Sequence, residues 1–391
     1  MKKVYRNLIV SALAIGFLTF NFIGEQAHAQ NRGSVKPTPA PTAKKSPSKT
    51  AKAVAKPTPK PTPKVKNTPK TWATPKKPVE AKNKPTPKPS NTPPSDSKPI
   101  GQIIVTATNV IVRQQASAKS NRLTAVRLGK ILPVVTRGAA FYQVKYETGK
   151  DGWIATGNTR DFDADKREAV YREIGDKYLK TKKFDFADAA EVTEFLRTAQ
   201  ALVKTDEARA DLGFKRLRFI AAALKTIPTG KGEQFPYKNF IKANERDIVY
   251  SEPSAEWSVR AESIWDLHGK FTALPIAEEI AWTAARTTIP GECEGYINCY
   301  LYNIRATDGE YLNFYPNGKY TQKSLTDIGN YLTPFVADIK DKTVYTPPTD
   351  ISDRAEFNRF LTELRTIISK VPNIEKNRIL KQINDLGEGY K

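Results

Sequence analysis

Two cysteines and one histidine are the residues best suited to covalent or metal chemistry. Cys293 and Cys299 are the only cysteines, and His268 is the one histidine beyond residue 30. A structural zinc ion takes four Cys or His ligands, more than this set supplies without a carboxylate. Outside the cytosol, an even cysteine count favours a disulfide. The sequence therefore predicts a Cys293–Cys299 disulfide, with no metal and no cofactor. Free thiols, or a metal bound by both cysteines, His268 and a carboxylate, are the alternatives.

Cleavage of a glycan needs only carboxyl groups, and the chain has several of them close to tryptophans. The group comprises Glu262, Glu278, Glu279, Glu292 and Glu294, with Trp257, Trp265 and Trp282. Glu262, Glu278 and Glu279 are therefore the candidate catalytic residues of a peptidoglycan glycosidase. The opposing interpretation is structural, because acidic residues early in a helix complement its dipole and tryptophans at helical spacing commonly lie in a core. We favour the structural interpretation and expect a non-catalytic protein, in which His268 is exposed or bonded to a polar partner.

Apolar residues recur about every 3.6 positions from residue 161 onward, which is typical of α-helices. Helices are expected over residues 169–179, 190–202, 214–227, 252–269, 275–285, 323–339, 353–370 and 374–386. Two x-Gly turns separate aromatic runs over residues 300–318, which predicts a β-hairpin or a three-stranded meander. The sequence thus predicts a mainly α-helical domain with a β-hairpin insertion over residues 161–391, of no family that we recognise.

Residues 101–160 have a different pattern, in which apolar and polar residues alternate as they do in β-strands. Strands are expected over residues 102–107, 110–113, 130–136, 141–146 and 153–155. Several short strands in one short segment are typical of a small all-β barrel.

The order of short motifs in this segment resembles that of bacterial SH3 domains. The motifs are Val110-Ile111-Val112-Arg113, the loop Ser117–Asn121, Val126-Arg127-Leu128-Gly129, Tyr142-Gln143-Val144 and Gly149-Lys150-Asp151-Gly152-Trp153. Ile111 and Gln115-Ala116 depart from the family pattern, which has Asn and Gly-Pro at these places. The resemblance covers residues 101–158 and implies a barrel that targets or scaffolds cell-wall proteins.

The expected barrel has side chains that would suit a ligand groove. The residues expected to contact a ligand are Phe141, Tyr142, Tyr146, Trp153 and Arg113. The alternative is that the aromatic residues belong to the barrel core, above all Trp153, which follows the turn at Gly152.

The first 29 residues predict export. A basic start, Met1–Arg6, precedes an apolar run over residues 8–23 and Ala27-His28-Ala29, a small-x-small cleavage signal. We expect cleavage after Ala29, and an uncleaved membrane anchor is the alternative. In both cases the rest of the chain lies outside the cytoplasm, in the periplasm or at the cell surface.

Residues 30–100 are rich in proline and lysine, a composition that cannot bury enough apolar surface to fold. The formal net charge of the chain is +22, and most of the excess lies in this segment, which contains 16 lysines. A folded nucleic-acid binder would gather its basic residues on one face, so we expect no nucleic-acid partner. The segment is expected to be a disordered tether, either adhering to an anionic wall polymer or serving as a solvated spacer.

Together these patterns predict a multidomain envelope protein. Its expected parts are a signal peptide (1–29), a disordered Pro/Lys-rich tether (30–100), an SH3-like barrel (101–160) and a mainly helical domain (161–391). We expect it to bind or scaffold cell-wall material, with peptidoglycan or another anionic envelope polymer as the partner. The alternatives are the glycosidase and an interaction module that docks another envelope protein. A membrane is a partner only if the signal peptide stays uncleaved.

Overall fold

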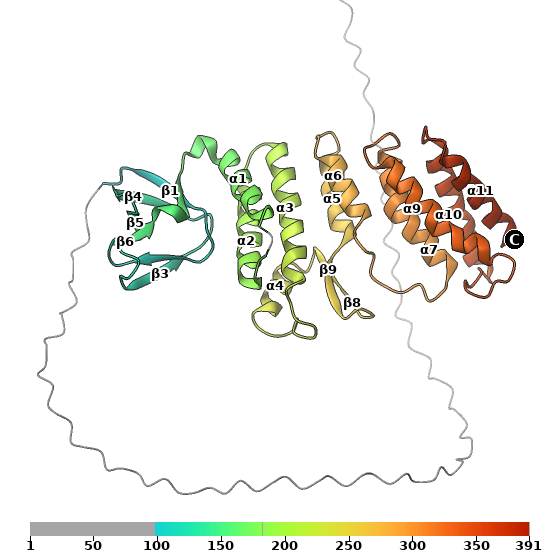
Figure 1. Ribbon diagram of the computed structural model, residues 1–391, viewed down its shortest axis with the longest axis horizontal. Coiled ribbons are helices and arrows are strands. Elements are labelled where there is room, and N and C mark those ends of the chain that lie inside the picture. The colour runs from blue at the N-terminus through green and yellow to red at the C-terminus, as the bar shows by residue number, and fades with distance from the viewer. Residues whose placement is uncertain (1–97, 182, 391) are drawn as a thin grey trace, which may run out of the picture. The chain divides into compact units, whose positions relative to one another are not determined.

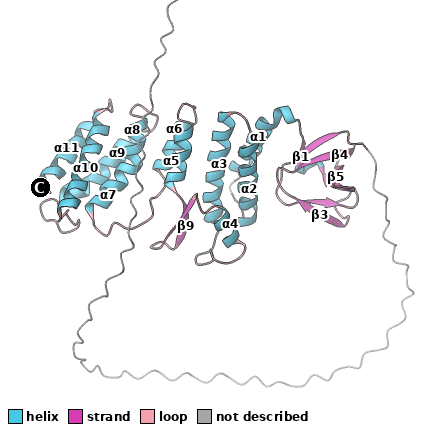
Figure 2. Cartoon of the chain, turned by 180° about the vertical axis from the view of Figure 1, so that it is seen from behind, coloured by secondary structure: helices cyan, strands magenta, loops and turns pink. Residues whose placement is uncertain are grey.

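The computed structural model describes residues 98–181 and 183–390, shown in Figures 1 and 2. The predicted signal peptide and almost all of the predicted tether lie outside these residues. Within them, a β region (residues 101–161) comes first and a mainly helical region follows. In this part of the chain, the structure contains no helix that is both long and apolar enough to cross a membrane.

The β region is a single antiparallel sheet with the strand order β3-β2-β6-β5-β4-β1-β7. Its strands are β1 (Gly101–Val105), β2 (Val110–Arg113), β3 (Arg122–Val126), β4 (Ile131–Arg137), β5 (Phe141–Glu147), β6 (Lys150–Ala155) and β7 (Thr159–Asp161). Alternate residues of each strand point to one face, where Val105, Val112, Val134, Val144 and Ile154 are fully buried in a common cluster. The five expected strands are confirmed, whereas β3 and β7 were not predicted.

The helical region follows the predicted periodicity over most of its length. Its helices are α1 (Arg167–Leu179), α2 (Phe186–Leu202), α3 (Asp206–Leu224), α4 (Tyr237–Ala243), α5 (Ala261–Lys270), α6 (Ala277–Ala285), α7 (Ile297–Ile304), α8 (Glu310–Phe314), α9 (Thr321–Asp338), α10 (Ile351–Ser369) and α11 (Lys376–Gly389). Asp185, Thr205 and Asp350 fix the starts of α2, α3 and α10, because each side chain accepts a hydrogen bond from the backbone N–H three residues further on. The largest hydrophobic cluster joins residues of α7, α9, α10 and α11.

The helix expected over residues 252–269 is wrong in its first half. Residues 248–259 form a two-stranded hairpin, β8 (Ile248–Ser251) and β9 (Glu256–Val259), and α5 begins only at Ala261. Ile248 and Val259 face each other across the hairpin, and both are buried against α3 and α5. Inward-facing residues of this segment therefore alternate with outward-facing ones, as in a strand, and do not recur every 3.6 positions as in a helix. The predicted hairpin insertion therefore exists, but at this place in the chain.

The hairpin or meander expected over residues 300–318 is also wrong. The segment is helical: α7 continues through a π-helical turn, Arg305–Gly309, into α8. Gly309 lies inside this helical run, where an added Cβ would be 3.1 Å from the carbonyl oxygen of Ile304. Leu301, Tyr311 and Leu312 are buried in the C-terminal cluster, so tertiary packing overrides the local turn signal.

The β region packs directly on the first helices. Ile104 and Leu128 belong to the same hydrophobic cluster as Phe195 of α2. A polar contact accompanies it: the Glu191 carboxylate accepts a hydrogen bond from the Leu128 backbone N–H at 2.6 Å. The Thr108 hydroxyl donates to a carboxylate of α2 at 2.6 Å as well. The two regions are thus joined by buried apolar contacts and by side-chain hydrogen bonds.

The predicted disulfide is confirmed, since Cys293 and Cys299 are bonded and their Cα atoms lie 5.4 Å apart. The bond closes a loop that leads into α7. Its reduction is expected to lower the free energy of unfolding by about 2 kcal/mol, because the unfolded chain loses a short loop constraint.

Urea denaturation with and without reductant measures this effect. The Cys293→Ser/Cys299→Ser variant should match the reduced protein and should not respond to reductant. Coincident unfolding midpoints for the oxidised and reduced protein would contradict the prediction.

Candidate functional site

Side chains of four neighbouring strands form a row across the outer face of the sheet. The strand register places Arg113 of β2 opposite Trp153 of β6, Trp153 opposite Gln143 of β5, and Gln143 opposite Thr136 of β4. Residues directly opposite each other in an antiparallel sheet point to the same face. Phe141, two residues from Gln143 on β5, therefore points to this face as well. We call Arg113, Phe141, Gln143 and Trp153 the outer-face strip.

The five residues expected to bind a ligand are divided between the two faces of the sheet. Arg113, Phe141 and Trp153 belong to the outer-face strip, and each is partly exposed. Tyr142 and Tyr146 point the other way and pack against the buried cluster that contains Val144. Trp153 lies outside that cluster, on the face opposite Ile154, so the alternative that placed Trp153 in the core does not describe this structure.

Hydrogen bonds fix both ends of the strip. The Arg113 guanidinium donates to the Ser120 carbonyl oxygen at 2.7 Å, which ties the serine-rich loop to β2. The Thr136 hydroxyl donates to the Gln143 side-chain oxygen at 3.0 Å. The strip thus presents a cation and two rings held on neighbouring strands, an arrangement suited to a ligand with an anionic group and an apolar part.

Tyr142 is occupied by a protein contact. The Arg137 guanidinium lies 5.1 Å from the centre of its ring and pairs with Asp161 at 2.6 Å. The hydrogen bond to Asp161 raises the pKa of Arg137, so the cation over the ring is permanent at physiological pH. This contact leaves the Tyr142 ring less available to a ligand than the rings of Phe141 and Trp153.

The candidate catalytic carboxylates Glu278 and Glu279 accept hydrogen bonds from α8 and from the turn between α8 and α9. Glu278 accepts hydrogen bonds from the Tyr311 hydroxyl at 2.7 Å and from the backbone N–H of Lys319. Glu279 accepts from the Tyr320 hydroxyl at 2.6 Å. Burial, and then the hydrogen bond to Glu278, raise the pKa of Tyr311, which keeps this phenol a donor. The structure places the third candidate, Glu262, on the exposed side of α5, away from these bonds.

His268 has a polar partner, as expected. Its side chain is buried, with 1% of its surface exposed, and its Nε2 lies 2.8 Å from the Tyr315 hydroxyl. Burial lowers the pKa of His268, so the ring is neutral near pH 7 and one of its nitrogens can share a hydrogen with the phenol. The surrounding rings of Trp265 and Phe314 make this histidine part of the core.

Sequence reasoning missed two polar sites that tertiary contacts create. One is a cluster in which Arg286, at the end of α6, pairs with Asp308 and Asp327. The other is a cavity lined by Tyr250 and Glu256 of the β8–β9 hairpin. Asp308 was assigned to a turn and Glu256 to a helix, so no sequence signal connected either residue to its neighbours in space.

Comparison with known proteins agrees with the barrel resemblance. Residues 108–159 match the bacterial SH3 domain family. This match coincides with the predicted segment 101–158 over residues 108–158 and covers six of the seven strands of the sheet, at least in part. The β region is therefore a bacterial SH3 domain. No curated protein and no solved structure matches the chain.

Proposed function

We propose that the chain is an exported, non-catalytic envelope protein that binds cell-wall material through the outer-face strip of its SH3 domain. The main support for this proposal is the strand register, which brings Arg113, Trp153 and Phe141 to one partly exposed face of the sheet. Bacterial SH3 domains often bind cell-wall material, and the N-terminal sequence pattern supports export. The helical region would then scaffold the SH3 domain or contact another envelope component.

The chemistry of the strip fits a peptide of the wall. Arg113 offers a guanidinium that pairs well with a carboxylate, which peptidoglycan peptides carry. Phe141 and Trp153 offer apolar ring surface, and rings of this kind often supply much of the energy of a binding interface. The Gln143 amide between them can donate to and accept from a peptide backbone. We therefore propose the peptide part of peptidoglycan as the ligand of the strip.

The non-catalytic assignment is supported by the hydrogen bonds of the carboxylates. One carboxylate oxygen of Glu278 accepts from the Tyr311 hydroxyl and the Lys319 N–H, and one oxygen of Glu279 accepts from the Tyr320 hydroxyl. These bonds attach both carboxylates to α8 and to the turn that follows it. Their positions are better explained by structural roles than by glycoside cleavage.

Trp153→Ala in the full chain is expected to weaken sedimentation with purified peptidoglycan at least about tenfold, since anchoring tryptophans commonly contribute about 2 kcal/mol or more. The measurement is made in about 1 M salt, where the screening length is about 3 Å, because residues 30–100 would otherwise adhere through their charge. Tyr302→Ala is the matched control, since Tyr302 is an exposed ring (44%) on α7.

Two results would overturn this proposal. Equal sedimentation of the Trp153→Ala and Tyr302→Ala proteins would remove the strip from wall binding. Release of sugar fragments into the supernatant would show catalysis and return attention to Glu262, Glu278 and Glu279.

A further inference from the structure

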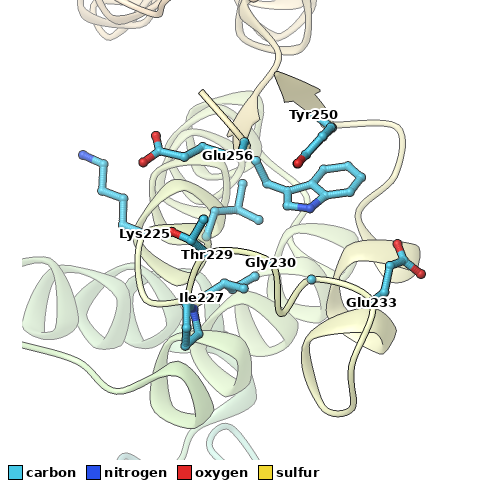
Figure 3. Close-up of a pocket in the computed structure, with 12 residues that line it drawn as sticks. Lys225, Ile227, Thr229, Gly230, Glu233, Tyr250 and Glu256 are labelled. Atoms are coloured by element: carbon cyan, nitrogen blue, oxygen red, sulfur yellow. The ribbon is translucent and has the colours of Figure 1, made fainter. Parts of the chain in front are cut away.

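The helical region contains a cavity that is lined by Trp257 but by none of the predicted catalytic or ligand-binding residues. It has a volume of about 480 Å³ and lies between the β8–β9 hairpin, the end of α3 and the 228–233 loop (Figure 3). This volume is within the range of small-molecule sites, about 300–1,000 Å³.

The cavity exists because the hairpin extends beyond the helix that supports it. Ile248 and Val259 are opposite each other at the base of the hairpin and are buried against α3. Tyr250 and Trp257 are the next pair on the same face, two residues further along. α3 ends at Leu224, and the loop that follows it forms the opposite wall of the cavity.

The second pair forms an aromatic wall. The ring centres of Tyr250 and Trp257 are 5.1 Å apart, and Tyr250 is 42% exposed. Gly232 allows the loop to approach this wall closely, because a Cβ added there would lie 2.7 Å from the indole nitrogen of Trp257. Exposed ring faces carry negative charge density and attract polarised C–H groups.

The polar groups around this wall are of both kinds, donors and acceptors. Figure 3 shows Lys225 and Glu256 at one side of the cavity and Tyr250 and Glu233 at the other. Among the described residues, no side-chain partner bonds to the Lys225 ammonium, the Glu256 carboxylate or the Tyr250 hydroxyl. The indole N–H of Trp257 is likewise without an acceptor there. Glu233 alone has an ion pair, a 3.3 Å contact with the exposed Lys238.

We propose that this cavity binds a neutral saccharide. A cationic ligand could pair with the carboxylates but would leave the Lys225 ammonium and the Trp257 N–H without an acceptor, and an anionic ligand would face two carboxylates, Glu233 and Glu256. A sugar has an apolar C–H face for the ring wall and hydroxyl groups that both donate to Glu256 and accept from Lys225. A sugar can thus contact the ring wall and bond to both Lys225 and Glu256 at once.

A neighbouring cavity extends the site. It has a volume of about 500 Å³ and shares Glu233, Tyr250 and Trp257 with the first. The aromatic pair thus borders two adjoining spaces, so a saccharide of more than one ring can contact it. This site is separate from the outer-face strip and does not depend on the function proposed for the SH3 domain.

The test is saturation-transfer NMR on the full chain with oligosaccharides of N-acetylglucosamine, glucose and xylose as probes. At least one probe is expected to bind, and Tyr250→Ala and Glu256→Gln are each expected to weaken that binding about tenfold, the loss of about 1.4 kcal/mol. Glu256→Gln keeps the size of an exposed side chain, so it tests the site without risk to folding. Tyr302→Ala, with a ring as exposed as that of Tyr250, is expected to bind like the unmodified chain.

Two outcomes would overturn the proposal: no transfer to any of the probes, or equal binding by the Glu256→Gln and Tyr302→Ala proteins. Neither outcome bears on wall sedimentation through Trp153. Failure of one proposal is therefore distinguishable from failure of the other.

Discussion

Replacing Arg286 with methionine is expected to lower the free energy of unfolding by about 3–5 kcal/mol, as breaking a buried ion pair does elsewhere. Arg286 pairs with Asp308 and, at 2.8 Å, with Asp327. Asp308 is only 2% exposed, so the substitution leaves a carboxylate in the core without its cation. Methionine keeps an apolar stem but lacks the guanidinium, whose central carbon lies 4.4 Å from the centre of the Trp282 ring, so the change removes this cation–π contact together with the ion pairs.

The loss of stability in the Arg286→Met protein is expected to depend on pH. Burial already raises the pKa of Asp308, and its effect exceeds the opposing effect of Arg286. Without Arg286 the folded-state pKa rises further above the unfolded value. Above that pKa the buried charge destabilises the fold to its full extent. As the pH falls below it, the penalty decreases, and it is absent once the pH is below the ordinary pKa that Asp308 has in the unfolded chain. The deficit of Arg286→Met relative to the unmodified chain should therefore shrink as the pH is lowered, measured by urea denaturation at a series of pH values.

Two control proteins make the result interpretable. Arg286→Met/Asp308→Asn should regain much of the lost stability, because the amide carries no charge to desolvate. Arg209→Met removes an exposed pair with Asp206 on α3 and should cost no more than about 1 kcal/mol. If Arg286→Met and Arg209→Met unfold at the same urea concentration, the cluster is not a buried ion pair in solution.

The strands of the sheet could be predicted only where buried and exposed residues alternate clearly in the sequence. In β4, Leu132 and Val134 are buried and their neighbours are not, so the sequence itself carries the period. In β3 a single residue, Val126, is buried, so no alternation marks the strand. The three residues of β7 include none that is buried, and this strand exists only because β1 supplies its hydrogen-bond partners.

The candidate groove shows a different limit of sequence reasoning. Phe141 and Tyr142 are consecutive in a strand, so they must point to opposite faces and cannot line the same groove. That separation was available from the sequence. Which face is the core depends on the register of β5 with β6, and only the structure supplies the pairing of Gln143 with Trp153. The ion pair of Arg286 with Asp308 is less predictable still, because it depends on how a π-helical turn packs beside α6.

Replacing Gly129 with alanine is expected to lower the free energy of unfolding by about 2–5 kcal/mol. Gly129 has a φ of +80°, which costs a non-glycine residue about 1–2 kcal/mol. An added Cβ would also lie 2.3 Å from the Phe195 ring of α2, and overpacking of this kind costs about 1–3 kcal/mol. Thermal or urea unfolding of the full chain measures the sum.

Gly149→Ala separates the two contributions. Gly149 has a similar φ of +70° in the β5–β6 turn, and no atom lies within 4 Å of the place where its Cβ would be. Gly149→Ala should therefore lower the free energy of unfolding only by the backbone contribution. The difference in free energy of unfolding between the two variants then measures the contact of the SH3 domain with α2. On a Phe195→Ala background, Gly129→Ala should cost no more than Gly149→Ala, because the ring that it meets is gone. Equal costs for the two glycine variants with Phe195 in place would instead mean that the SH3 domain does not rest on α2. In that case Glu191, whose carboxylate bonds to the Leu128 N–H, would be dispensable for stability too.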